Sequence, residues 1–186
     1  ISMLLAIDNG TQACLLAPTE ILADQHFQGL KKFADLLGVS IAKLTGSVKK
    51  KDRVEIHEGL TSGTLNILVG THAIFEDVVQ FKNLGLCIID EQHRFGVAQR
   101  AKLWDKNKQI HPHVLVMTAT PIPRTLHMSL SGIRDISALT VAPDGRQEIE
   151  TILAYSDDED MLRETILREK NRGGQVYFLH NRVTSI

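Results

Sequence analysis

The sequence predicts an α/β domain, in which helices cover a parallel β-sheet. Short apolar runs alternate along the chain with longer stretches of helical character. The runs are continuously apolar, which is typical of strands that are buried on both faces. The repeated strand–helix order implies parallel neighbours joined by right-handed crossovers. The predicted strands are Ala13–Ala17, Val39–Leu44, Leu65–Val69, Leu86–Ile89 and Val114–Met117.

The composition is that of a soluble globular protein. The chain has 186 residues, of which 43% are hydrophobic and 23% charged, enough for one packed domain and part of a second. The formal net charge of −1 gives no overall sign of a nucleic-acid partner, so such a contact must come from local patches. Cys14 and Cys87 each lie in an apolar run, which favours a reducing, cytoplasmic setting over a disulfide framework.

The first ten residues are predicted to be the end of a helix that stops at Asn9-Gly10. We therefore expect the chain to begin inside an element of a longer protein. The segment is too short to span a bilayer and lacks the basic region of a signal peptide, so no membrane partner is expected.

Two helices are predicted between the early strands. The first begins after Thr19, a suitable N-cap, and stops at Gly38. Its apolar residues repeat at spacings of four and three, which places them on one helical face. The basic run Lys49–Arg53 is best interpreted as the solvated first turn of the second helix, and phosphate contact is the alternative.

Polar residues follow every predicted strand. In a parallel sheet the carboxyl ends of the strands lie along one edge, where open α/β folds bind their ligands. Hydroxyls, carboxylates and imidazoles at all of these ends predict a functional site. The segments are Pro18-Thr19-Glu20, Thr45-Gly46-Ser47, Gly70-Thr71-His72, Asp90-Glu91-Gln92-His93 and Thr118-Ala119-Thr120-Pro121.

Asp90 and Glu91 come directly after a buried strand. Two adjacent carboxylates beside a core are costly unless a cation lies against them. Phosphoryl-transfer motors use this arrangement, in which Asp90 would hold Mg²⁺ through its waters and Glu91 would polarise the attacking water. The alternative is that both acids simply favour the N-terminus of the next helix.

Several stretches are similar to those of known helicases. The sequence DEQH at 90–93, followed by a separate strand that ends in TATP at 118–121, resembles superfamily 2 helicases. APTEILADQH, GTHAIF, IIDEQHRFGVAQR and MTATPIPRTL closely resemble the RecG family of branched-DNA helicases, over about Ile1–Leu126. Further along, GIRDIS and RGGQVYFLHNRV look more like Mfd-type transcription-repair coupling translocases, which share this motor type.

The resemblance implies a RecA-like motor that uses ATP and Mg²⁺ and acts on branched or forked DNA. It implies that Asp90 and Glu91 are the Walker B acids, with Asp90 as the Mg²⁺ residue, and that His93 links the nucleotide site to the TAT segment. Thr118 and Thr120 would couple hydrolysis to strand movement. Contacts with the nucleic-acid backbone are implied for Pro18, Thr19, Glu20, Thr45, Gly46, Gly70, Thr71 and His72.

By this resemblance, residues 1–145 form a first RecA-like domain that is incomplete at its N-terminus, and residues 146–186 begin a second one. The phosphate-loop pattern G-x-x-x-x-G-K-[ST] does not occur in the sequence. In this family that loop comes just before the helix whose end is predicted at Ile1–Gly10, and its strand would lie beside the TAT strand. We therefore expect the 186-residue chain to be inactive alone.

The C-terminal part is predicted to begin a second α/β unit. A helix from Pro121 to about Ser131 and a Pro- and Gly-containing linker at 141–146 come first. A strand at Ile149–Ala154, a helix opened by a capping box at Ser156–Glu159 and a strand at Gln175–Leu179 then follow. Because the last strand has no partner domain, we expect it to dock on the first domain or on a neighbouring chain, as an edge-paired or domain-swapped oligomer.

Three functions stay open at this point. The first is a RecG-type helicase motor. The second is an Mfd-type translocase, which moves on duplex DNA without separating the strands. The third is a non-catalytic binding module that has kept the fold; against it, both acids and the TAT segment are intact.

Overall fold

A computed structural model describes residues 1–104, 106–107, 111–119, 135–141, 145, 149–155 and 158–179. The chain divides into two compact units, residues 1–136 and 137–186. The division into two motor domains after residue 145 stays a prediction. Each unit is described by itself below.

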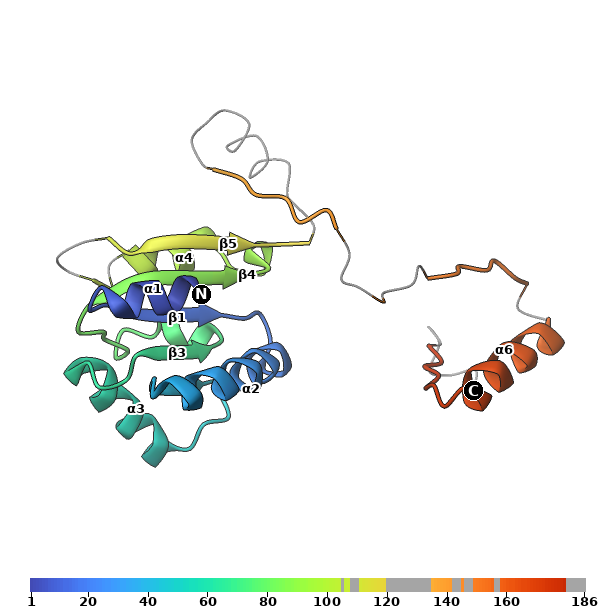
Figure 1. Cartoon of the computed structure of the whole chain (residues 1–186), viewed down its shortest axis with the longest axis horizontal. Coiled ribbons are helices and arrows are strands. Elements are labelled where there is room, and N and C mark those ends of the chain that lie inside the picture. Colours follow the sequence, from blue (N-terminus) through green and yellow to red (C-terminus); the bar gives the residue numbers. More distant parts are fainter. Residues whose placement is uncertain are drawn as a thin grey trace. The chain divides into compact units, whose positions relative to one another are not determined.

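The first unit is built on five parallel strands in the order β2-β3-β1-β4-β5 (Figure 1). The predicted parallel α/β fold is therefore confirmed. The central strand β1 pairs with β3 on one side and with β4 on the other, so that Cys14 lies between Leu68 and Cys87. The strands are β1 (Gln12–Leu16), β2 (Ile41–Leu44), β3 (Ile67–Gly70), β4 (Leu84–Asp90) and β5 (His113–Met117).

Helices precede or connect the strands, and the first three lie where the sequence predicted them. They are α1 (Ser2–Asp8), α2 (Glu20–Leu37), α3 (Lys50–Ser62) and α4 (Val97–Trp104), with short 3-10 turns η1 (His72–Phe75) and η2 (Gln92–Arg94). Thr19 caps α2 by accepting a hydrogen bond from the Leu22 amide at 3.3 Å, and Gly38 ends it in the left-handed conformation. Lys49 is the N-cap of α3, so the basic run does form the first turn of a helix.

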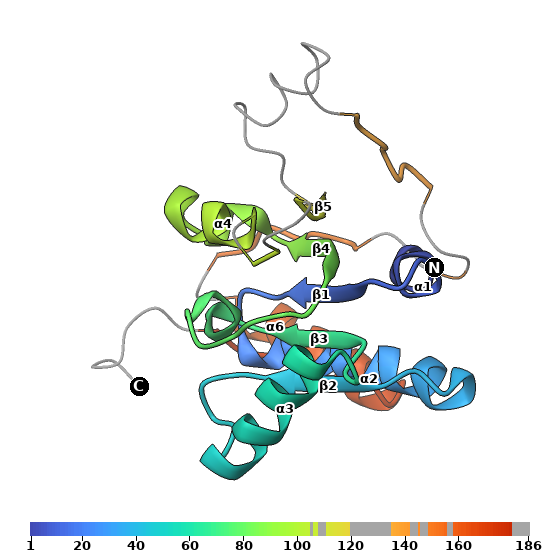
Figure 2. The same cartoon turned by 90° about the vertical axis from the view of Figure 1, so that its left-hand side faces the viewer.

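Two apolar clusters cover opposite faces of the sheet, because successive strand residues point to alternate sides. Ala13, Leu15 and Ile88 face the layer of α1 and α2. Cys14, Leu16 and Ile89 face the layer that contains residues of α3, η1 and α4. Figures 1 and 2 show these helices around the strands. A side chain of β4 therefore packs against one helix layer or the other, depending on the face of the sheet to which it points.

The two cysteines meet across the centre of the sheet. Cys14 Sγ and Cys87 Sγ are 3.0 Å apart, and both thiols are free and buried. The hydrogen bond with Cys87 and the burial raise the pKa of Cys14 well above its usual range. Cys14 is therefore neutral, and both cysteines are buried in the core without a disulfide, as the sequence predicted.

The second unit contains the helix α6 (Glu159–Asn171), which has no buried residue. Its N-cap is Asp158, whose side chain accepts a hydrogen bond from the Met161 amide at 3.2 Å, and so the prediction that the cap starts at Ser156 was wrong. Asp158 is a suitable N-cap because its carboxylate can accept a hydrogen bond from the backbone amide three residues later.

The two strands predicted for the second unit were also wrong. The segments 149–155 and 175–179 are described, and neither is a strand. Leu153 is 99% exposed and Tyr177 is 91% exposed. A β-strand needs a hydrogen-bonded partner and a buried face, and neither segment has a strand partner within the described part of the chain. The predicted helix after Pro121 lies outside the described residues.

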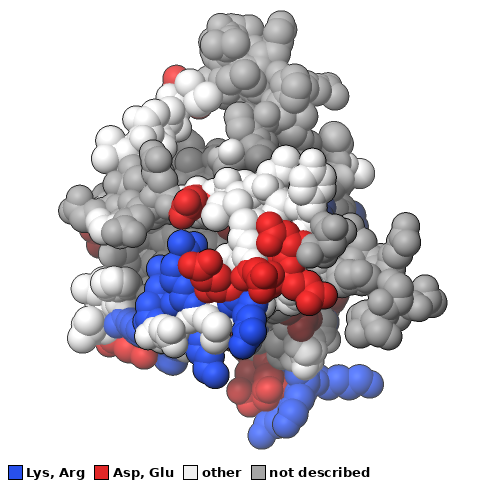
Figure 3. Space-filling view, turned by 90° about the vertical axis from the view of Figure 1, so that its right-hand side faces the viewer, with Lys and Arg blue, Asp and Glu red and all other residues white. Residues whose placement is uncertain are grey.

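The surface carries mixed charge. Figure 3 shows a group of acidic side chains beside a group of basic ones on the face that it draws. This agrees with a formal net charge of −1. Among the helices that are described, none has the length and apolar character needed to cross a membrane.

Candidate functional site

The carboxyl ends of the five strands bring the predicted site residues to one edge of the sheet. Following the strand order, Thr45 and Gly46 come after β2, Gly70 to His72 at the end of β3, and Pro18 to Glu20 after β1. Asp90 to His93 then follow at the end of β4, and Thr118 comes after β5. Thr120 lies outside the described residues. The edge therefore has a part rich in hydroxyls at β1 to β3 and a part rich in carboxylates and imidazoles at β4 and β5.

The backbone of Glu91 is strained. With φ of 49° and ψ of 56°, Glu91 is the single non-glycine residue with a positive φ among the residues described. This conformation costs an L-residue about 1–2 kcal/mol and persists where the surroundings enforce it, commonly at functional sites. Here the Glu91 amide donates a hydrogen bond to the Met117 carbonyl at 2.9 Å. That bond ties the end of β4 to the end of β5.

The carboxylate of Glu91 is held by residues that the sequence predicted to work with it. Oε2 accepts a hydrogen bond from Thr118 Oγ1 at 3.0 Å, and His93 Nδ1 lies 3.4 Å from the same oxygen. The Glu91 side chain is 27% exposed, so solvent water can reach it. It makes no capping bond to η2, the turn that follows it. Glu91 nevertheless stands at the N-terminus of η2 as its N-cap residue, so the alternative, in which both acids favour that position, stays open.

Asp90 has a partner that was not predicted from the sequence. His26 Nε2, on α2, lies 2.9 Å from Asp90 Oδ2. The contact arises because Asp90 follows Ile89, which faces the other layer, and so points toward α1 and α2. A signal existed in the sequence: His26 stands three residues after Ala23 and four before Leu30, on the apolar face of α2 that packs on the sheet.

The loops after β1 and β2 are joined by a carboxylate. Glu20 accepts hydrogen bonds from the Ser47 hydroxyl at 2.9 Å and from the Ser47 amide at 3.2 Å. The Ser47 hydroxyl is the main cause of a lowered pKa for Glu20, which keeps this exposed side chain ionised. Arg53, at the first turn of α3, donates to the Thr45 carbonyl at 3.0 Å and to Glu76 at 3.1 Å. The hydroxyl-rich part of the edge is thus ordered by its own side chains.

The eight residues predicted to contact nucleic acid differ in exposure. Thr19, Glu20, Gly46 and His72 are exposed, and Pro18 is half-buried. Thr45, Gly70 and Thr71 are buried. The Thr71 hydroxyl has no hydrogen-bond partner within the described part of the chain. Contact with nucleic acid stays a prediction for all eight residues. Thr45, Gly70 and Thr71 lie beneath the surface of these loops.

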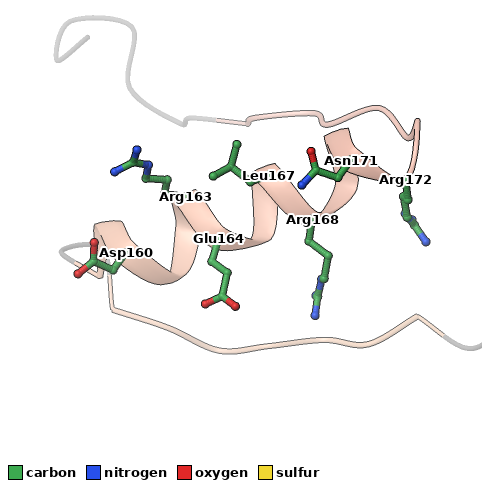
Figure 4. Close-up of a pocket in the computed structure, with 7 residues that line it drawn as sticks. All are labelled: Asp160, Arg163, Glu164, Leu167, Arg168, Asn171 and Arg172. Atoms are coloured by element: carbon green, nitrogen blue, oxygen red, sulfur yellow. The ribbon is translucent and has the colours of Figure 1, made fainter.

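Two surface hollows lie away from these residues. One, of about 680 Å³, runs along α6, and Figure 4 shows its lining, from Asp160 on that helix to Arg172 at its C-cap. The other, of about 650 Å³, lies where β4 and β5 begin, between Asn9, the C-cap of α1, and His113. Neither includes a predicted site residue. In the described parts of the chain, no group of three or more His, Cys, Asp or Glu residues is placed to hold a metal ion.

Curated relatives carry helicase and translocase names. The chain is 49% identical to the ATP-dependent DNA helicase RecG of Synechocystis over 178 residues, which is 96% of this chain and 21% of that protein. It is 43% identical to RecG of Aquifex aeolicus, over 97% of this chain and 23% of that protein. It is also 46% identical to the transcription-repair-coupling factor of Haemophilus influenzae, over 98% of this chain and 16% of that protein. The chain thus spans about a fifth of the length of these relatives.

A solved structure agrees with these sequence matches. The structure of RecG bound to a three-way DNA junction covers 99% of this chain and 25% of its own, with a TM-score of 0.75 and 35% sequence identity. The resemblance to RecG that was inferred from four short stretches is confirmed. The family model for the DEAD/DEAH box helicases matches residues 1–129. That match spans the whole described sheet with the Glu91–Thr118 connection at its edge, and the chain belongs to the DEAD/DEAH box helicase family.

Proposed function

We propose that this chain is the first motor domain, with the beginning of the second, of a RecG-type ATP-dependent DNA helicase that remodels branched DNA. The observation that carries the proposal is the hydrogen bond of 3.0 Å between Glu91 and Thr118. It joins the acid that would act on water to the segment that would drive strand movement. Identities of 49% and 43% to two RecG proteins over nearly the whole chain support this assignment.

Asp90 fits the part of a magnesium residue. Mg²⁺ prefers oxygen ligands, and in ATPases it is usually held by one or two carboxylates, several waters and the phosphates of the substrate. The Asp90 carboxylate ends β4 and stays 19% exposed, with its Oδ2 bonded to His26. Asp90 would hold the ion through its waters. When bound, the ion neutralises the charge that develops on the phosphates.

Glu91 would orient the attacking water. A carboxylate in this role must be held still, because a small misplacement costs much of the rate. The left-handed backbone, the bond to Met117 and the bond from Thr118 supply that restraint. His93 lies close to the same carboxylate oxygen. It would link the nucleotide site to the segment after β5.

The opposite part of the edge would contact the DNA backbone. Hydroxyls and main-chain amides can bind phosphate without many basic residues, which agrees with the formal net charge of −1. Thr19, Gly46 and His72 are exposed there. Such contacts position a strand without reading its sequence. A motor that uses ATP to act on DNA would work in the cytoplasm.

Glu91→Gln in the full-length protein tests the proposal. The amide keeps the size of the side chain but removes the negative charge that would polarise water. Hydrolysis should fall by about 10²–10⁴-fold, while binding of a fluorescent ATP analogue stays within about 3-fold, since Glu91 does not hold the nucleotide in this scheme.

Glu58→Gln is the matched control, because Glu58 is exposed on α3 and lies outside the site. It should leave both values unchanged. Turnover of Glu91→Gln within a few-fold of the parent would contradict the assignment of Glu91. A parent without any ATP hydrolysis would contradict the proposed function itself.

A transcription-repair coupling translocase is the second candidate, and the 46% identity to the Haemophilus influenzae factor favours it. The two functions separate in one experiment on the full-length protein. Separation of the strands of a forked DNA supports the helicase. Release of stalled RNA polymerase from DNA, without separation of fork strands, supports the translocase.

A further inference from the structure

One side-chain contact links α2 to the end of β4. His26 Nε2 is 2.9 Å from Asp90 Oδ2, although the two residues are 64 positions apart in the sequence. Their side chains are 30% and 19% exposed. An ionised carboxylate can only accept hydrogen bonds, so the imidazole donates its Nε2 proton to Asp90.

This contact restricts a side chain that would otherwise turn freely. The terminal torsion of an aspartate is broad, so the backbone of β4 does not fix the direction of the carboxylate oxygens. His26 is the hydrogen-bond partner of the Asp90 carboxylate among the residues that the structure describes. The bond engages Oδ2 and leaves Oδ1 unengaged by the imidazole.

The helix that carries His26 is itself well anchored. Ala23 is fully buried against the sheet, and Phe27 and Leu30 pack against the same cluster. The Thr19 cap fixes the start of α2, and Lys43 of β2 donates to Asp24 on its first turns. The packing of α2 therefore fixes the position of the His26 imidazole next to Asp90.

We infer that His26 is a positioning residue, which orients the Asp90 carboxylate to hold the waters of Mg²⁺ bound to ATP. The inference rests on the proposed ATP hydrolysis and deepens it. A residue that donates a hydrogen bond to a metal-binding side chain fixes the orientation of that side chain. Replacing such a residue typically lowers metal affinity or activity by about 10–100-fold. The same contact ties α2, which begins at the hydroxyl-rich part of the edge, to the magnesium residue.

Two substitutions in the full-length protein separate positioning from packing. His26→Phe keeps a ring of similar size but has no N–H to donate. His26→Gln places an amide N–H near the position of Nε2. Gln25→Phe is the matched control, since Gln25 is the exposed neighbour on the same helix.

Two measurements are needed, one of which does not depend on turnover. The first is the affinity for Mn²⁺ in the presence of a non-hydrolysable ATP analogue, followed by electron paramagnetic resonance. The second is kcat and KM for ATP with DNA present. His26→Phe should weaken Mn²⁺ binding by about 10-fold or more and lower kcat by about 10–100-fold, whereas His26→Gln and Gln25→Phe should stay within about 3-fold of the parent.

Three outcomes would overturn the inference. Parent-like Mn²⁺ affinity and kcat in His26→Phe would show that the hydrogen bond does not orient Asp90. Equal losses in His26→Phe and His26→Gln, together with a lowered Tm, would assign His26 to packing. If the parent does not hydrolyse ATP, both the proposed function and this inference are contradicted. If the parent is active and His26→Phe is unaffected, only this inference is contradicted.

Discussion

At the scale of single residues, Thr118 and Glu91 form the most informative contact in the molecule. The threonine hydroxyl donates to the carboxylate across the ends of β5 and β4. Glu91 is also held by its amide bond to Met117 and by the nearby His93. Removing the hydroxyl therefore cuts the side-chain link between Thr118 and Glu91, while the backbone bond to Met117 and the nearby His93 still restrain Glu91.

We expect Thr118→Val to uncouple hydrolysis from movement. Valine keeps the branched shape of threonine and lacks the hydroxyl. A hydrogen bond to a charged group contributes about 1.5–3 kcal/mol, so fork unwinding by the full-length protein should fall by about 10-fold or more. DNA-stimulated ATP hydrolysis should stay within about 3-fold of the parent.

Thr118→Ser, which restores the hydroxyl, should recover unwinding. Equal losses of hydrolysis and unwinding in Thr118→Val would instead show that the threonine only supports the position of Glu91. The two assays can be run on the same preparations.

At the scale of secondary-structure elements, the approach of β2 to β3 is unusually close. Leu44 and Gly70 are paired in the sheet, and the Leu44 carbonyl accepts a hydrogen bond from the Thr71 amide at 3.2 Å. A Cβ atom at Gly70 would lie 2.1 Å from the Leu44 carbonyl oxygen. A backbone oxygen cannot move aside as a flexible side chain does, so this position requires glycine.

Gly70→Ala should therefore destabilise the fold, by about 1–3 kcal/mol or more. The same substitution at Gly29 is the control, because Gly29 lies inside α2 and a Cβ added there would meet no atom within 4 Å. Alanine there should raise stability by about 0.5–1 kcal/mol through its better helix propensity.

Urea unfolding followed by circular dichroism measures both changes. Opposite signs are expected for the two glycines. A Gly70→Ala protein as stable as the parent would mean that β2 and β3 can separate at their carboxyl ends without cost.

At the scale of the whole molecule, the chain holds part of the machinery that such a motor needs. Hydrolysis needs amides and a lysine around the phosphates, a metal residue, a residue that aligns water, and an arginine that neutralises charge. Asp90 and Glu91 supply the second and third of these in the proposed scheme. The phosphate-loop pattern does not occur among the 186 residues.

We expect the 186-residue chain alone to show no measurable ATP hydrolysis. Without the phosphate-loop pattern, the amides and the lysine that would surround the phosphates are missing from this chain, and the nucleotide is hardly bound. Turnover by a purified sample that disappears in Glu91→Gln would contradict this expectation, since a contaminant would not respond to that substitution.

The same chain should bind DNA weakly and without regard to sequence. Few basic side chains are involved, so affinity should depend only mildly on salt compared with a basic DNA-binding protein. Fluorescence anisotropy with a labelled strand, at several salt concentrations, measures the slope.

The sequence by itself determined the order of elements and the edge at which the site lies. Continuous apolar runs marked the strands, and Thr19 and Gly38 marked the limits of α2, because burial on both faces and helix capping are local requirements. The polar strand ends marked the site for a similar reason: parallel strands must all end at one edge. These features depend on residues close together in the chain.

The tertiary structure alone decided which side chains meet. The contact of His26 with Asp90 spans 64 positions and depends on how α2 packs over β4. The burial of Thr45 and Thr71 depends in the same way on neighbouring strands. The segment 175–179 shows the converse, since its apolar residues suited a strand and yet no partner strand is present in the described residues. A strand and a side-chain contact both need a second segment, and its position is set by the packing of the whole fold.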